Sequence, residues 1–375
     1  MKVERGKISG SQLMALLVLT RLVPVTIEFP SVTGINPPQD AWVSSLGATL
    51  LSIPVILLMA HLSLKYSDKT IIEYSQLLLG NFFGKIVGFV LVWYWLSVAA
   101  TMLRSVGDAY TTAIMPETPI LAFIITMALL GANAARSGLE VVGRLGEVNM
   151  LVVILFVLLT LSLPYKVMSF ENLLPVLARG IKPIMLPMGT AISFFVEFII
   201  LGMVVPCLND TGALIRSSLG AVAISGAVMT AFTVVLIAVF GPTLSSLMLP
   251  AFSLARMISI GEFLERLEVI PMGAWTITVA ITLAFFFWAS AVGMAQLFGL
   301  RRFQSLVYPL AAISVAFSIL FFESFLDLEL YFNEVWVAYS LSVTLGITII
   351  LYVAALVRGR SSASGKVTRL CRRNR

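Results

Sequence analysis

The sequence predicts an all-α membrane protein with about ten transmembrane helices. Of its 375 residues, 59% are hydrophobic and 12% are charged, and the mean hydropathy is +1.00. Soluble domains keep about a quarter of their residues charged, so this chain has too little charge for a water-facing surface. The apolar residues form blocks of roughly 18 or more, which is the length that crosses the hydrocarbon core as a helix. The alternation typical of β-barrel strands is absent.

Ten spans are predicted, and turn-forming or charged residues separate them. Asn36, Pro37 and Pro38 lie between the first two blocks, and Arg301 and Arg302 follow the eighth. The first block is too long for a cleaved signal peptide, so we expect it to remain as the first span. The predicted spans are 9–33, 40–62, 84–114, 119–135, 141–163, 186–208, 216–240, 272–298, 304–322 and 334–357.

The distribution of Lys and Arg predicts that both ends of the chain are cytoplasmic. With the N-terminus inside, 18 of the 25 basic residues fall on the cytoplasmic side and five on the outside. This is the positive-inside bias, and it also explains the net charge of +6 as topology and attraction to anionic lipid instead of nucleic-acid binding. We expect a cytoplasmic N-terminus over 1–8, one transmembrane domain over 9–357 and a basic cytoplasmic tail over 358–375.

The chain shows no motif for catalysis or for a bound metal. Cys207 and Cys371 have no CxxC spacing, and His61 is the only histidine, so neither a thiolate site nor a Ser/His/Asp relay is predicted. The sequence contains no nucleotide-binding loop. We therefore expect no enzyme activity, no cofactor and no metal.

Two outer segments are long enough to hold short helices. One is 164–185, and the other is 241–271, in which Ser253–Glu268 is predicted as an amphipathic surface helix. Such segments either cover the outer mouth of a carrier or serve as passive connectors.

Ten spans divide into two halves of five, and an odd number per half inverts the second half relative to the first. This is the inverted-repeat plan of many secondary carriers, in which the first helix of each half is broken. We predict repeat one over about 9–163 and repeat two over about 186–357. Pro24 and Glu28 lie in the first span, and Glu197, Gly202 and Pro206 lie in the sixth, so both spans combine a carboxylate with a helix breaker.

Two glutamates within spans are the leading site candidates, because a buried charge in a membrane helix is costly and usually functional. Glu28 and Glu197 are each expected to face a substrate ammonium or to carry a proton. Alternatively, Glu28 pairs with Arg21 or with Arg104, or lies nearer the outer interface. Four residues at the expected breaks complete the predicted binding site around the glutamates: Val25, Thr26, Phe194 and Phe195.

The third span carries a stripe of Tyr94, Val98 and Thr101 on one helix face, and this stripe either lines a cavity or packs in the core. Arg104 continues the stripe, and a structural salt bridge to Asp108 or Glu28 is the favoured interpretation. Trp288 in the eighth span is expected either to wall a pocket or to face lipid. The spacing of Gly80, Gly84 and Gly88 predicts close helix packing.

The order of short motifs along the chain resembles a known family, the permease-like B subunits of spore nutrient germinant receptors. This family lies within the amino acid–polyamine–organocation superfamily. The resemblance extends along the chain and depends on the order and spacing of short motifs. These are Lys7-Ile8-Ser9 with Gln12, Asp40-Ala41-Trp42, Glu73-Tyr74, Leu79-Gly80-Asn81 with Gly84-Lys85, 136–140 with Gly143-Arg144, 172–177 with Gly180, Ile181 and Pro183, and 194–197 with Pro206.

The resemblance implies a LeuT-like fold and a site between helices one, three, six and eight that senses a small nutrient, often an amino acid. It also implies A-type and C-type receptor subunits as partners in the spore inner membrane. Val23-Pro24-Val25 departs from the glycines usual at the break in helix one, which favours a small or apolar ligand or a paralogue with altered specificity. An active proton-coupled amino acid transporter and a membrane scaffold or ion and water conduit remain as alternatives.

Overall fold

The computed structural model describes residues 4, 6–32, 38–247, 249–257 and 269–373, with side chains left out for 25–32, 269–271 and 359–373. Within these residues, seven helices are long and apolar enough to cross a membrane, and three shorter apolar helices accompany them. The ten helices correspond to the ten predicted spans, so the all-α prediction is confirmed. The described part of the chain holds no strand beyond an isolated β-bridge between Ile8 and Leu208.

The observed helices begin and end within a few residues of the predicted spans, except at the chain's last helix. Nine spans are single α-helices: α1 Gly10–Val32, α2 Ala41–Lys65, α4 Asn81–Ala113, α5 Ile120–Arg136, α6 Leu139–Ser162, α9 Ala213–Phe240, α11 Val269–Phe298, α12 Gln304–Leu320 and α14 Val337–Arg373. The sixth span is composite, with α7 Lys182–Phe195, a 3-10 segment Val196–Ile200, α8 Leu201–Val204 and a second 3-10 segment Val205–Cys207. Helix α14 continues past the predicted end at residue 357.

Short helices occupy the connections, and one of them overlaps the start of a predicted surface helix. Helix α10 runs over Pro250–Arg256, earlier than the surface helix expected at Ser253–Glu268, and residues 258–268 lie outside the described part. A proline at its first turn fits this start, because proline lacks the N–H that a helix N-terminus leaves unpaired. The other short elements are α3 Ile71–Leu79, α13 Phe325–Tyr331, the π-helix Phe332–Trp336 and the 3-10 turns Pro38–Asp40, Leu163–Lys166, Phe170–Leu173 and Gly241–Ser246.

Helix α3 was not predicted as a separate element, although its boundaries have local causes. Thr70 and Glu73 form a capping box at its start, in which each side chain accepts a hydrogen bond from the other's backbone N–H. Gly80 ends the helix with a φ of 84°, a conformation that favours glycine. The chain therefore turns there and begins α4.

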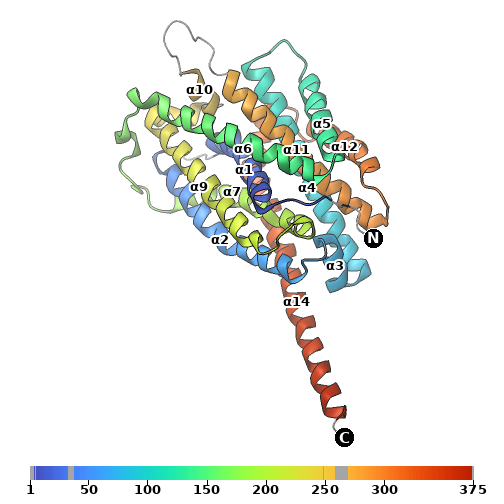
Figure 1. Ribbon diagram of the computed structural model, residues 1–375. Helices are drawn as coiled ribbons and strands as arrows, with labels where there is room; N and C mark the ends of the chain where they lie inside the picture. Colours follow the sequence, from blue (N-terminus) through green and yellow to red (C-terminus); the bar gives the residue numbers. More distant parts are fainter. Residues whose placement is uncertain (1–3, 5, 33–37, 248, 258–268, 374–375) are drawn as a thin grey trace.

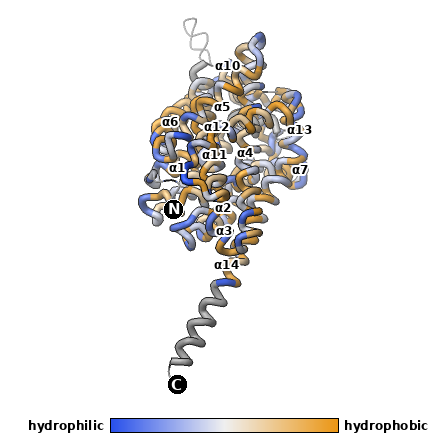
Figure 2. The backbone as a smooth tube through the Cα atoms, turned by 90° about the vertical axis from the view of Figure 1, so that its right-hand side faces the viewer, coloured by the Kyte–Doolittle hydropathy of each residue, from blue (hydrophilic) through white to orange (hydrophobic). Residues whose placement is uncertain are grey.

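The sixth span and α11 form the centre of the bundle, while α6 lies at its surface. In their most apolar windows, 83% of the residues of the sixth span and of α11 are buried, compared with 28% for α6. Helix α1 packs against α6, α9 and α11, and α2 packs against α7 and α9 (Figure 1). Figure 2 shows hydrophobic residues throughout the bundle, as expected when both core and outer surface avoid water.

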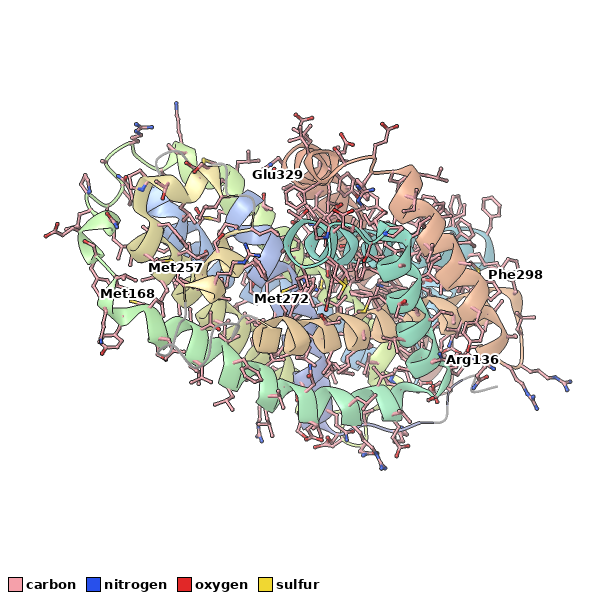
Figure 3. The ribbon with its side chains drawn as sticks, turned by 90° about the horizontal axis from the view of Figure 1, so that it is seen from above. Arg136, Met168, Met257, Met272, Phe298 and Glu329 are labelled. Atoms are coloured by element: carbon pink, nitrogen blue, oxygen red, sulfur yellow. The ribbon has the colours of Figure 1, made fainter. Side chains whose placement is uncertain are left out.

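Segments that the topology predicts on opposite sides of the membrane lie at opposite ends of the bundle. Met168 and Met257 lie at one end, and Arg136 and Phe298 lie at the other (Figure 3). At the predicted cytoplasmic side, the backbone N–H of Ile8 donates to the carbonyl of Cys207 at 2.9 Å. The chain's beginning is thus attached to the end of the sixth span.

The predicted breaks in the first and sixth spans have different outcomes. The sixth span is irregular from Val196 onward, as expected. Helix α1, in contrast, keeps helical backbone geometry from Gly10 to Val32, so the expected break at Pro24 is not present. A proline inside a membrane helix removes one backbone hydrogen bond, and its neighbours can accommodate that loss without ending the helix.

Candidate ligand site at the irregular sixth span

The backbone irregularity in the sixth span frees carbonyl groups that other helices bind. A 3-10 segment bonds to the residue three positions away instead of four, so the last carbonyls of α7 lose their usual partners. A guanidinium N–H of Arg21, in α1, donates to the carbonyl of Phe194. The hydroxyl of Ser340, in α14, donates to the carbonyl of Ser193 at 3.0 Å. The irregular segment is therefore held by side chains from two other spans.

The same arginine forms the principal ion pair of the core. The guanidinium of Arg21 donates to the carboxylate of Glu197, and the two side chains are only 1% and 2% exposed. The guanidinium also lies over the ring of Phe198, 5.6 Å from its centroid. A buried charge is costly unless it is paired and hydrogen-bonded, and here each charge neutralises the other. The predicted acidic group in the sixth span is thus balanced from the first span.

Tyr94, in α4, joins this network through Ser340. The phenol oxygen of Tyr94 lies 2.7 Å from the hydroxyl oxygen of Ser340. Because Ser340 donates to the Ser193 carbonyl, the phenol is the donor in this bond. The Tyr94 ring stacks on Trp336 with a centroid distance of 6.1 Å. We call Arg21, Tyr94, Ser193, Glu197 and Ser340 the polar cluster.

The remaining residues of the predicted stripe in α4 have local partners. The hydroxyl of Thr101 donates to the carbonyl of Val98 at 2.8 Å, so it is satisfied within its own helix. The Nε of Arg104 donates to the carboxylate of Asp108 at 2.8 Å, and its guanidinium also donates to the carbonyl of Phe322. The predicted structural salt bridge between Arg104 and Asp108 is confirmed, and Arg104 also binds the segment that follows α12.

Phe194 and Phe195 lie beside the polar cluster, but their rings contact other aromatics. The Phe194 ring lies 5.8 Å from Phe332 and 6.1 Å from Trp336, centroid to centroid. The Phe195 ring meets Phe198 edge to face at 6.3 Å. The two rings thus build an apolar wall on the sixth span. Among the described residues, the carbonyl of Phe194 is the polar contact that this pair makes with the cluster.

Trp288 has partners that sequence reasoning did not indicate. Its indole N–H donates to the carboxylate of Glu4 at 2.9 Å, and its ring stacks on Phe285. Trp288 therefore contacts the N-terminal segment instead of the polar cluster. Val25, Thr26 and Glu28 lie in α1, but their side chains are outside the described part, so their predicted roles stay predictions.

The geometry of the polar cluster suits a ligand that carries both charges. All described members of the predicted site are at most 4% exposed, so the site is closed in this conformation. A guanidinium can bind a carboxylate through two parallel hydrogen bonds, and a carboxylate can accept from an ammonium. A zwitterion could therefore replace the internal pair, with one charge on each partner. Over the described residues, no group of three or more His, Cys, Asp and Glu is placed to hold a metal.

Sequence reasoning identified Glu197 but did not assign its partners. Arg21 was considered only as a partner for Glu28, and Ser340 was not singled out. The available signal was the opposite charge of Arg21 at a comparable depth in the first span. Ser340 has no distinguishing signal, because serines are plentiful in the spans of this chain.

Sequence comparison relates the chain to spore germination proteins. The family described as "Spore germination protein" matches residues 7–326. The chain is 27% identical to spore germination protein KB of Bacillus subtilis over 315 residues, which cover 82% of this chain and 83% of that protein. It is 26% identical to spore germination protein A2 of the same organism over 285 residues, covering 76% of this chain and 78% of that protein.

Solved transporter structures share the fold at low sequence identity. The chain resembles MhsT, solved in complex with L-phenylalanine, with a TM-score of 0.64 and 10% identity over 94% of this chain and 89% of that one. A sodium-coupled sialic acid symporter gives a TM-score of 0.68 with 14% identity over 92% of this chain and 79% of that one. This likeness confirms the predicted LeuT-like fold of five plus five helices for an integral membrane protein.

Proposed function

Because the chain belongs to the spore germination protein family, we propose that it is the nutrient-sensing subunit of a spore germinant receptor, built on a transporter scaffold. The observation that carries this proposal is the buried pair of Arg21 and Glu197, which bridges the first span and the irregular sixth span. The ligand class that fits the pair is a small zwitterion of the amino-acid type.

Ligand binding would act by opening this bridge. The carboxylate of the ligand binds the guanidinium of Arg21, and the ammonium of the ligand binds the carboxylate of Glu197. The ligand then separates two spans that the internal pair holds together. A ligand shifts a conformational equilibrium only through a difference in affinity between two states, and exchange of one ion pair for two new contacts supplies such a difference.

The proposed setting is the inner membrane of the dormant spore, with both ends of the chain in the cytoplasm. The partners would be an A-type and a C-type receptor subunit, which read the change in conformation, and membrane lipid. The chain would bind its ligand without chemical conversion. The polar cluster supports this assignment, because its charges are arranged for recognition by hydrogen bonding.

The test is a thermal-shift screen of the purified chain against amino acids, sugars and nucleosides. A ligand at a hundred times its dissociation constant stabilises the folded state by about 2.7 kcal/mol. We expect a hit in the wild type that Glu197→Gln loses. The matched control is Glu140→Gln, which removes a half-exposed carboxylate paired with Arg144 outside the cluster. An unchanged response in Glu197→Gln would rule out the polar cluster as the sensing site.

The same variants separate sensing from assembly in the spore. Glu197→Gln, unlike Glu197→Ala, keeps a side-chain oxygen that accepts from Arg21, so spores that carry it in place of the wild type are expected to assemble the complex and to lose the response to the identified ligand. Spores that carry Glu140→Gln should keep both. Loss of the assembled complex in Glu197→Gln spores would instead indicate a structural role for the pair.

A further inference from the structure

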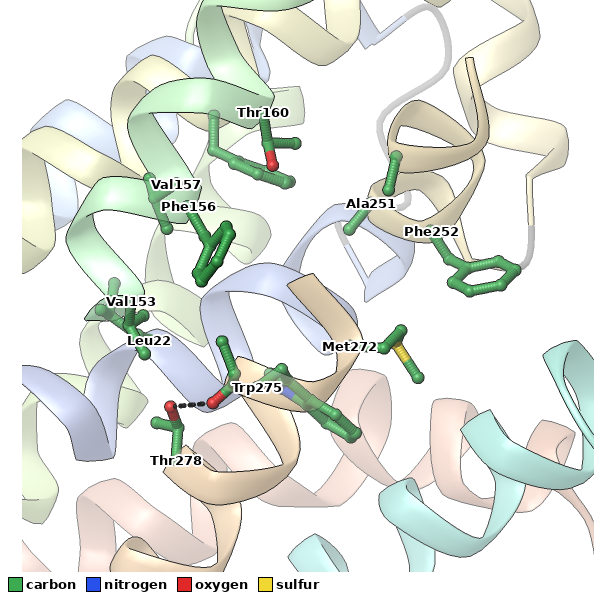
Figure 4. A pocket seen from close by; sticks show the side chains of 13 residues that line it. Leu22, Val153, Phe156, Val157, Thr160, Ala251, Phe252, Met272, Trp275 and Thr278 are labelled. Carbon is green, nitrogen blue, oxygen red and sulfur yellow. Dashed lines mark hydrogen bonds between the residues drawn. The ribbon is translucent and has the colours of Figure 1, made fainter. Parts of the chain in front are cut away.

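A cavity unrelated to the polar cluster lies beneath α10. It is enclosed by α1, α6, α9, α10 and α11 and holds about 660 Å³ of space that no atoms fill, its open mouth included (Figure 4). Of this space, about 80 Å³ can hold the centre of a water-sized molecule. A single water needs about 10–15 Å³ on that measure, so the cavity has room for a small organic group. None of the five members of the polar cluster lines this cavity.

The walls of this cavity are apolar and aromatic. Phe156 comes from α6, Phe232 from α9, Phe252 from α10 and Trp275 from α11. None of the lining side chains is charged. A zwitterion would have to leave water here without an opposite charge to receive it, which is strongly unfavourable. The cavity therefore selects a neutral occupant.

Three side chains of the described lining are polar, and one of them, Trp275, carries a fully buried donor without a partner. The hydroxyl of Thr278 accepts from the amide of Asn149 at 3.0 Å and donates to the carbonyl of Ala274 at 2.8 Å. The indole N–H of Trp275, in contrast, is buried and has no hydrogen-bond partner among the described residues. A buried indole N–H usually finds an acceptor, because leaving it unpaired is costly. Because other atoms cover this N–H, the ring of Trp275 must turn before an acceptor in the cavity reaches it.

Small residues keep the cavity open. Ala251 and Ala255 come from α10, and Ala274 comes from α11. Protein interiors are normally packed to the density of organic crystals, so apolar walls that face unfilled space forgo dispersion contacts. An apolar occupant would recover these contacts without displacing any existing hydrogen bond.

From these features we infer that the cavity beneath α10 is a second binding site, which takes a neutral and mostly apolar group with one hydrogen-bond acceptor for Trp275. The group is a small uncharged solute, or the acyl chain of a lipid with its ester carbonyl as the acceptor. This inference is independent of the proposed zwitterion site, because it depends on different residues and on different chemistry.

Helix α10, which lines the cavity, also contacts the end of α4. The guanidinium of Arg256 lies over the ring of Phe252, 4.5 Å from its centroid, and donates to the carbonyl of Ala113 at 3.0 Å. Ala113 is the last residue of α4, the helix that carries Tyr94. An occupant that contacts Phe252 therefore touches the residue that supports the link between α10 and α4.

The test uses bromine quenching of Trp275 fluorescence in the full chain, reconstituted in lipid nanodiscs. One arm adds 4-bromobenzyl alcohol as a neutral apolar solute, and the other arm uses phosphatidylcholine with brominated acyl chains. The contribution of Trp275 is the difference between the wild type and Trp275→Phe. We expect saturable quenching of this contribution in one arm, which identifies the source as solute or as lipid.

Variants that fill the cavity decide whether the quenching arises there. Ala255→Leu and Ala274→Leu should each raise the quencher concentration at half-maximal quenching of Trp275 about tenfold. This corresponds to a loss of about 1.4 kcal/mol in binding. Ala122→Leu, an exposed alanine on α5, is the control and should leave it unchanged. Phe156→Ala enlarges the cavity and should keep or strengthen the quenching even if a filling variant folds poorly.

Two results would overturn the inference. One is the absence of saturable Trp275 quenching in both arms. The other is equal quenching in the wild type, in both filling variants and in Ala122→Leu, which would place the probe in bulk lipid near Trp275. Neither result bears on the zwitterion site, because that site is tested through Glu197.

Discussion

The guanidinium of Arg21 and the carboxylate of Glu197 form a buried ion pair that joins α1 to the 3-10 segment of the sixth span. The residues are 176 positions apart, and neither has more than 2% of its side chain exposed. Removing one partner of a buried pair leaves an uncompensated charge, whereas replacing both with apolar residues is often tolerated. Comparing a single with a double replacement therefore tests whether the pair stabilises the fold.

Glu197→Ala should destabilise the folded chain by about 3–5 kcal/mol, because it leaves the Arg21 charge buried without its partner. The double variant Arg21→Met, Glu197→Leu should recover most of this loss. The measurement is the free energy of unfolding in mixed detergent micelles. Glu140→Ala, whose pair with Arg144 lies at the surface, should change it little. If the double variant were as unstable as Glu197→Ala, the pair would not be the origin of the effect.

Tyr94→Phe should cost about 1 kcal/mol of stability, since the Ser340 hydroxyl loses the donor that it accepts from. The substitution keeps the ring and its stacking on Trp336, so a larger effect is not expected. The same unfolding measurement applies. Tyr165→Phe serves as control, because Tyr165 is 66% exposed. Equal free energies of unfolding for Tyr94→Phe and Tyr165→Phe would contradict the hydrogen bond between Tyr94 and Ser340.

Gly84→Ala should destabilise the packing of α3 against α4 by about 1–3 kcal/mol, the usual cost of overpacking. A Cβ atom at Gly84 would lie 2.3 Å from the Cα of Gln76, and backbone cannot move aside as a flexible side chain can. Gly346→Ala in α14 is the control, because nothing lies within 4 Å of a Cβ there. It should be neutral or slightly stabilising, since alanine favours helices.

Glu4→Gln should loosen the N-terminal segment from the bundle. The Glu4 carboxylate accepts from the indole of Trp288 and from the backbone N–H of Gly6 at 2.6 Å. An amide is a weaker acceptor than a carboxylate, so the Gly6 amide should exchange with solvent faster. Hydrogen exchange measured by mass spectrometry on the N-terminal peptide reports this change. Exchange identical to that of the wild type would show that Glu4 does not hold the segment.

The sequence by itself determined the membrane class, the approximate positions of the ten spans and the short-range contacts. Each span must be long and apolar enough to cross the lipid, whatever its neighbours are, and the basic residues in its flanking loops set its orientation. Both properties can therefore be recognised segment by segment. The pair of Arg104 and Asp108 was predictable for the same reason, since residues four apart on a helix face each other. Glu197 could be singled out because a carboxylate in a span is costly.

The tertiary structure alone decided which helix faces meet. The partner of Glu197, the link from Trp288 to Glu4 and the cavity beneath α10 join residues that are far apart in sequence. The continuity of α1 through Pro24 was also decided there, because proline weakens a helix without determining whether its neighbours support it. Such contacts depend on the rotation and depth of each helix in the packed bundle, and hydrophobicity along one span does not encode them.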